Sequence, residues 1–137
     1  MPKNQRHAAD YAQDAAEAIR EYNHLTLNSP ATALPYPSSI GDSLLALESL
    51  AARLPQALHQ TSHRVGVIAK DPAAFTTSDV GAAQAATEIG HALKAATAAA
   101  TELARLLRLS ASLANTIALR VDDELDTEQH QDEDEQP

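Results

Sequence analysis

The stretch that decides the fold is residues 86–121, ATEIGHALKAATAAATELARLLRLSASLANTIALRV. Small and aliphatic residues recur in it at alternating spacings of three and four, and no proline interrupts the series. The members of the series are Ala86, Ile89, Leu93, Ala96, Ala100, Leu103, Leu107, Ser110, Ala114, Ile117 and Val121. This spacing keeps side chains on one side of a helix, as in coiled coils. The pattern therefore predicts one long helix over residues 79–121, with an apolar stripe along its length.

A second stripe with the same spacing covers residues 40–68. Its members are Ile40, Leu44, Leu47, Ala51, Leu54, Leu58, Thr61, Val65 and Ile68. Pro55 lies inside the stripe, and a proline in a helix removes a backbone hydrogen bond and introduces a kink. The spacing is unchanged on both sides of Pro55. We therefore expect one continuous helix that is kinked at this residue, rather than two helices.

The remaining segments complete an all-α prediction. Residues 6–23 read as a shorter amphipathic helix, a proline-rich linker follows to residue 38, and residues 69–78 read as a turn. Alanine and leucine favour helices, and the aromatic residues that sheets prefer are scarce. We expect a long antiparallel helical hairpin, with the first helix docked across residues 40–54 and 103–117 to form a three-helix bundle. The other end would be a two-helix arm packed through alanines.

The acidic charge is concentrated at the end of the sequence. Residues 122–137 contain nine Asp and Glu and no Lys or Arg, whereas the whole chain has a net charge of −9. Such a run cannot bury apolar surface and repels itself. We expect a helical domain over residues 1–121 and a disordered acidic tail over residues 122–137, into which the long helix extends by a turn or two.

Composition argues against several classes of function. The chain has no cysteine, which excludes disulfides and thiolate metal sites, and it has no run of about 18 apolar residues for a membrane span. Its four glycines form no phosphate-binding loop, and no serine lies in a nucleophile elbow. The arginines outside the first helix are scattered: Arg53, Arg64, Arg105, Arg108 and Arg120. We expect a soluble cytoplasmic protein that is not an enzyme, carries no cofactor, and does not bind nucleic acid or membranes directly.

One short motif suggests signalling chemistry. The stretch Gly90-His91-Ala92-Leu93-Lys94 resembles the phosphoacceptor motif of histidine phosphotransfer domains, which are helical bundles with a solvent-facing histidine. The resemblance implies that His91 accepts a phosphoryl group and that Lys94 helps to balance its charge. The family has a glycine after the lysine, where this chain has Ala95. Phosphotransfer through His91 is therefore the alternative hypothesis.

Two pairs of side chains have the spacing of metal ligands. His59 and His63 are four residues apart on one helix, and Glu88 and His91 are three apart on the next. A Glu-x-x-His pair is typical of di-iron carboxylate bundles, whose ligands project into the core. All four residues lie off the two apolar stripes, so they are expected to point outward. We predict no metal site.

The leading hypothesis is an interaction protein. Residues 8–12 through 18–26, and Tyr36-Pro37 followed by residues 50–58, resemble small all-helical proteins of GC-rich bacterial genomes, which have no established activity. That resemblance implies a bacterial, cytoplasmic protein. A narrow alanine stripe buries little area, so we expect the arm to self-associate or to bind a protein partner. The candidate interaction residues are Ala86, Ile89, Leu93, Ala96 and Ala100. A third hypothesis is a small regulator whose acidic tail binds a basic site.

Overall fold

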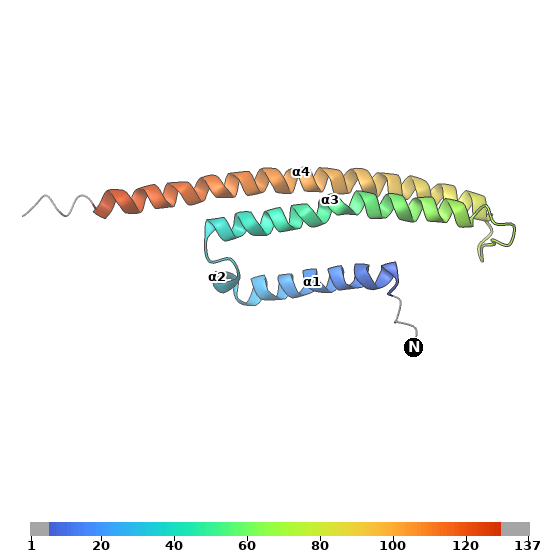
Figure 1. Cartoon of the computed structure of the whole chain (residues 1–137), viewed down its shortest axis with the longest axis horizontal. Coiled ribbons are helices and arrows are strands. Elements are labelled where there is room, and N and C mark those ends of the chain that lie inside the picture. Colours follow the sequence, from blue (N-terminus) through green and yellow to red (C-terminus); the bar gives the residue numbers. More distant parts are fainter. Residues whose placement is uncertain (1–5, 130–137) are drawn as a thin grey trace, which may run out of the picture.

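The computed structural model describes residues 6–129, and within that range it is helical and contains no strand. Its helices are α1 (Ala8–Asn28), α2 (Pro30–Ala33), α3 (Pro37–Ile68) and α4 (Ala82–Gln129) (Figure 1). The all-α class predicted from the sequence is therefore confirmed. Residues 130–137, which form the second half of the predicted tail, lie outside the described residues.

The first helix is longer than residues 6–23, and the predicted linker is mostly helical. The backbone N–H of His7 donates to the Asp10 carboxylate at 2.7 Å, so the helix begins at Ala8. It continues to Asn28, where the next residues, Ser29 and Pro30, end it. Pro30 then opens the single turn of α2. Proline suits a first helical position because it needs no hydrogen-bond partner there.

The second long helix begins at Pro37 rather than at residue 40. Proline again occupies the first turn, and its fixed φ is already helical. The helix then passes through Pro55 and ends at Ile68. Apolar packing against α4 on both sides of Pro55 compensates for the missing backbone hydrogen bond.

The longest helix is displaced toward the C-terminus relative to the predicted range of 79–121. It begins at Ala82, because residues 77–80 form bends in the loop, where Thr76 Oγ1 donates to the carbonyl oxygen of Ser78 at 3.1 Å. It ends at Gln129, so it extends about two turns into the acidic segment, as expected from the sequence. Glutamate and glutamine are good helix formers, and they let the helix continue into the acidic segment.

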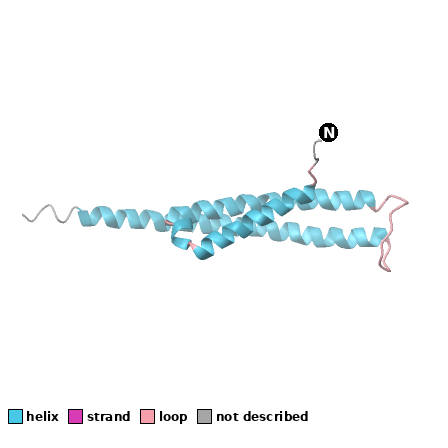
Figure 2. Cartoon of the chain, turned by 90° about the horizontal axis from the view of Figure 1, so that it is seen from below, coloured by secondary structure: helices cyan, strands magenta, loops and turns pink. Residues whose placement is uncertain are grey.

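Helices α3 and α4 lie side by side and run in opposite directions, whereas α1 lies below α3 in Figure 1 and crosses the pair in Figure 2. No Cα of α1 comes within 8 Å of a Cα of α3 or α4. A single side-chain hydrogen bond of 2.7 Å, between Tyr22 Oη and Ser43 Oγ, joins α1 to α3. Packed helices have axes about 8–10 Å apart. The three-helix bundle expected from the sequence is therefore not confirmed.

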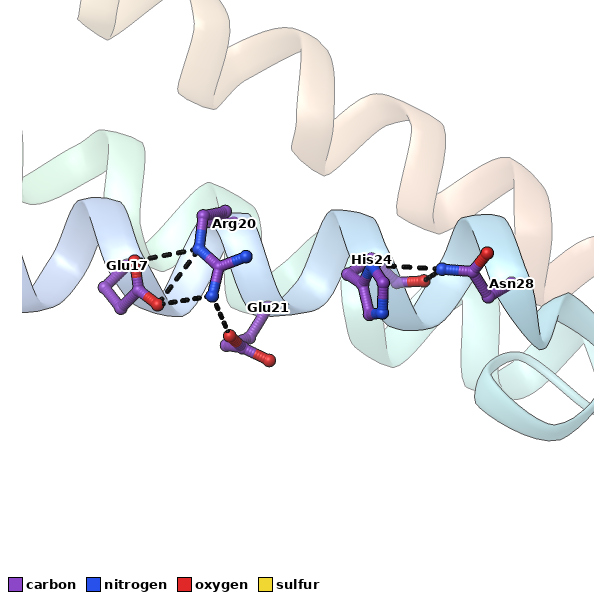
Figure 3. Close-up of polar contacts among 5 residues, drawn as sticks. All are labelled: Glu17, Arg20, Glu21, His24 and Asn28. Atoms are coloured by element: carbon purple, nitrogen blue, oxygen red, sulfur yellow. Dashed lines mark hydrogen bonds and ion pairs between the residues drawn. The ribbon is translucent and has the colours of Figure 1, made fainter.

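The outward side of α1 is polar. Arg20 donates to Glu17 at 2.7 and 2.9 Å and pairs with Glu21, and the Asn28 amide donates to the His24 carbonyl oxygen at 2.8 Å (Figure 3). The Arg20 guanidinium lowers the pKa of the Glu17 carboxyl.

Among the described helices, none is both long and apolar enough to cross a membrane.

Candidate interaction surface

The contact between α3 and α4 is built from small residues. The buried residues of the described chain are Gly41, Glu48, Ala51, Ala100, Ala104, Ala111 and Ala114. No large side chain in this part of the chain is fully buried. A Cβ added to Gly41 would lie 2.4 Å from Asn115 Oδ1, so the two helices approach closely at this point. Alanine and glycine permit that approach because they leave no side chain to separate the backbones.

The structure divides the predicted interaction residues between two sides of α4. Ala86 and Leu93 are half-buried toward α3, and Ala100 is buried, whereas Ile89 and Ala96 are exposed. The residues that pack in their place come one position later along the helix, at Gly90, Thr97, Ala104 and Ala111. Three of them, Gly90, Ala104 and Ala111, are smaller than the residue before them and allow a shorter separation between the helices.

Helix α3 shows the same shift by one residue. It turns Gly41, Glu48, Pro55, Ser62 and Ala69 toward α4, and the residues before them are exposed, except Leu47, which is half-buried. We call the side of the pair that these preceding residues form the open face. The open face consists of Ile40, Leu47, Leu54, Thr61 and Ile68 of α3, and Ile89, Ala96, Leu103, Ser110 and Ile117 of α4.

Both halves of the open face lie on one side of the α3–α4 pair. In each helix, every open-face residue comes one position before a residue that faces the other helix. The open-face stripe is therefore offset from the contact in the same rotational direction about each helix axis, viewed along the chain. Two antiparallel helices rotated in the same sense bring such stripes to a common side. Ile68 and Ile89 accordingly line one apolar hollow of about 190 Å³, together with Phe75 of the loop.

One charged pair crosses the contact on the side opposite the open face. The Glu48 side chain is only 12 % exposed, and it pairs with Arg108, whose side chain is 73 % exposed. Sequence reasoning missed Glu48 because the predicted stripe ran through Leu47. The seven-residue repeat of Gly41, Glu48, Pro55 and Ser62 is the signal that marks the buried side of α3.

The candidate phosphoacceptor lies on the surface. His91 is exposed, and Lys94 lines a shallow hollow of about 380 Å³ between α3 and α4. His59 and Ser62 of α3 line the same hollow. A lysine and a histidine side by side can attract an anion, but the His91 ring does not line this hollow.

The residues with metal-ligand spacing are dispersed. His59, His63, Glu88 and His91 are all exposed, and Glu88 accepts a hydrogen bond from the Gln84 amide at 3.0 Å. Among the side chains that the structure describes, residues 6–117, no three His, Asp or Glu are grouped closely enough to hold a metal ion.

Two arginines of α4, Arg105 and Arg108, pair with acidic side chains. Arg105 donates to Glu102 at 2.7 and 2.8 Å, and its guanidinium lowers the pKa of that carboxyl. The geometry therefore offers apolar surface rather than a reactive cluster.

No protein family, curated protein or solved structure matches this chain.

Proposed function

We propose that the chain is a non-catalytic helical interaction protein of the bacterial cytoplasm, which self-associates or binds a protein partner through the open face. The antiparallel α3–α4 hairpin, packed as a short coiled coil, is its structural unit. The observation that carries this proposal is the distribution of the large aliphatic residues. Ile40, Leu54 and Ile68 of α3, and Ile89, Leu103 and Ile117 of α4, are all between 41 and 58 % exposed.

The exposed residues represent unused hydrophobic stabilisation. Burying a leucine or isoleucine fully contributes about 1.5–3 kcal/mol, so covering the exposed half contributes about 1 kcal/mol for each residue. Single exposed leucines are common on protein surfaces, but contiguous apolar patches mark interaction sites. The open face is such a patch, and its large aliphatic residues stay partly exposed although α1 lies on the same side.

The three-helix bundle predicted from the sequence is the competing arrangement. In it, α1 would close on the open face and no partner would be needed. In the structure, no Cα of α1 comes within 8 Å of α3 or α4, and the large open-face residues remain partly exposed, which supports a partner as the covering element.

Sedimentation velocity combined with hydrogen exchange tests the proposal. We expect the purified chain to sediment as an oligomer, or as a monomer whose α3 and α4 amides exchange quickly until a partner binds. A strict monomer in which the α3 and α4 amides resist exchange would contradict it, because such a monomer needs no partner.

Phosphotransfer through His91 is the second candidate, supported by the exposure of His91 and by Lys94 one turn further along α4. The test is incubation with a phosphorylated response-regulator receiver, with His91→Gln as the control. Acid-labile phosphate on the native chain but not on the variant would support this function. Its absence from the native chain would exclude it.

A further inference from the structure

We propose that the open face is covered by a second copy of this chain, related to the first by a two-fold axis that lies between the two copies, perpendicular to the helices and at the level of Leu54 and Leu103. This inference rests on the proposed function and names its partner. The two copies would form a four-helix bundle in which every neighbouring pair of α3 and α4 helices is antiparallel.

The register of α3 against α4 places the open-face residues in layers. Gly41 lies beside Asn115, Glu48 pairs with Arg108, and Ser62 lies beside Gly90. In two antiparallel helices, a step forward along one helix matches a step backward along the other. Each open-face residue of α3 therefore lies near the level of an open-face residue of α4. The resulting layers are Ile40 with Ile117, Leu47 with Ser110, Leu54 with Leu103, Thr61 with Ala96, and Ile68 with Ile89.

These layers form a pattern that is nearly the same read from either end. The two outer layers each contain two isoleucines, and the central layer contains two leucines. Each intermediate layer contains a small hydroxyl residue, Ser110 in one and Thr61 in the other. A two-fold axis through the central layer therefore places isoleucines of one copy on isoleucines of the other. A self-complementary patch of this kind is what a symmetric dimer interface requires.

Length and charge also favour a second copy. Each stripe extends over about 42 Å, from Ile40 to Ile68 or from Ile89 to Ile117, whereas the 21 residues of α1 extend over about 32 Å. The stripes of a second copy have the same length as those of the first, because the two chains are identical. The open face contains no charged residue, so pairing two such faces buries no charge.

Helix α1 lies on the same side as the open face but does not fill it. Ala8 and Ala12 of α1 line a hollow of about 460 Å³ with Thr61 and Ile68 of α3. Displacing α1 breaks the Tyr22–Ser43 hydrogen bond, and α1 contains no buried residue. The segment between Ser29 and Tyr36 joins α1 to α3 and is the place where α1 would turn away.

Single cysteine variants of the full chain test the proposal, because the native chain has no cysteine. Leu54 and Leu45 are equally exposed, at 41 and 42 %, but Leu45 lies outside the open face. Thiols held at a two-fold axis have a far higher effective concentration than freely colliding ones. We therefore expect Leu54→Cys to form a disulfide-linked dimer at least about tenfold faster than Leu45→Cys in dilute solution. In mixtures, Ile40→Cys should link to Ile68→Cys faster than to Ile117→Cys.

The other outcomes separate this inference from the proposed function. Equal rates for Leu54→Cys and Leu45→Cys, or a preference of Ile40→Cys for Ile117→Cys, would overturn the proposed axis. A monomer in which the Leu54→Cys thiol reacts freely with a small reagent would overturn the second copy, but it would leave the proposed function with a different protein as partner. A monomer in which that thiol is protected would show that α1 covers the face, and both proposals would then fail.

Discussion

Replacing Ala111 with leucine tests the small-residue contact between α3 and α4 directly. Ala111 is 1 % exposed, and its carbonyl oxygen would lie 3.7 Å from a Cβ at Gly41, so the helices are in close contact there. A leucine adds three carbon atoms where no space exists. Overpacking of this kind costs about 1–3 kcal/mol, because the helices must separate or the side chain must adopt a strained rotamer.

The expected effect is large enough to measure by thermal unfolding. A loss of about 2 kcal/mol lowers the Tm of a domain of this size by about 10 °C. Circular dichroism at 222 nm, recorded at one protein concentration for all samples, gives the Tm. Ala98→Leu is the matched control, because Ala98 is exposed on the same helix and leucine is nearly as good a helix former as alanine. An unchanged Tm for Ala111→Leu, or an equal decrease for Ala98→Leu, would refute the small-residue contact.

Three further predictions follow from the described contacts. Gly66→Ala should raise the free energy of unfolding by about 1 kcal/mol in urea titrations, because a Cβ at Gly66 meets no atom within 4 Å and alanine favours the helix; a loss of stability would contradict this. Arg108→Ala should lower the free energy of unfolding by about 1–2 kcal/mol, because it leaves the nearly buried Glu48 carboxylate without its partner. Glu48→Leu should lower it less, and the reverse order in the same titrations would argue against the pairing. Helicity should fall as the solution is acidified, because Arg105 lowers the pKa of Glu102 in α4. The ionised Glu102 stabilises the helix fully above the ordinary pKa of a glutamate, and this stabilisation is lost as the pH falls through the lowered pKa. Ellipticity between pH 7 and pH 2 measures it, and Arg105→Gln should show a smaller acid-dependent loss.

The sequence was sufficient for the class of fold and for the two long stripes. Alanine and leucine recurring every three or four residues leave few alternatives to amphipathic helices. The helix ends were less predictable. Residues 25–28 contain no helix breaker, and their continuation as helix depends on the short-range hydrogen bonds of Thr26 and Asn28. The start at Pro37 depends on proline suiting a first turn.

The candidate site required the structure, because both stripes are broader than one helical contact. From the sequence alone, both Leu103 and Ala104 fit a position that faces α3. Leu103 is 48 % exposed and Ala104 is 8 % exposed in the structure. Sequence patterning ranks leucine first because it assumes that the largest apolar residues are buried.

The amino-acid sequence by itself determined that this protein is all-helical, because helix propensity and apolar spacing are local properties of the chain. Only the tertiary structure decided which side of each stripe is buried, because that choice depends on how closely two backbones approach. Glycine and alanine at seven-residue intervals allow α3 and α4 to pack closely. The isoleucines and leucines of the open face are displaced from that contact and remain on the surface.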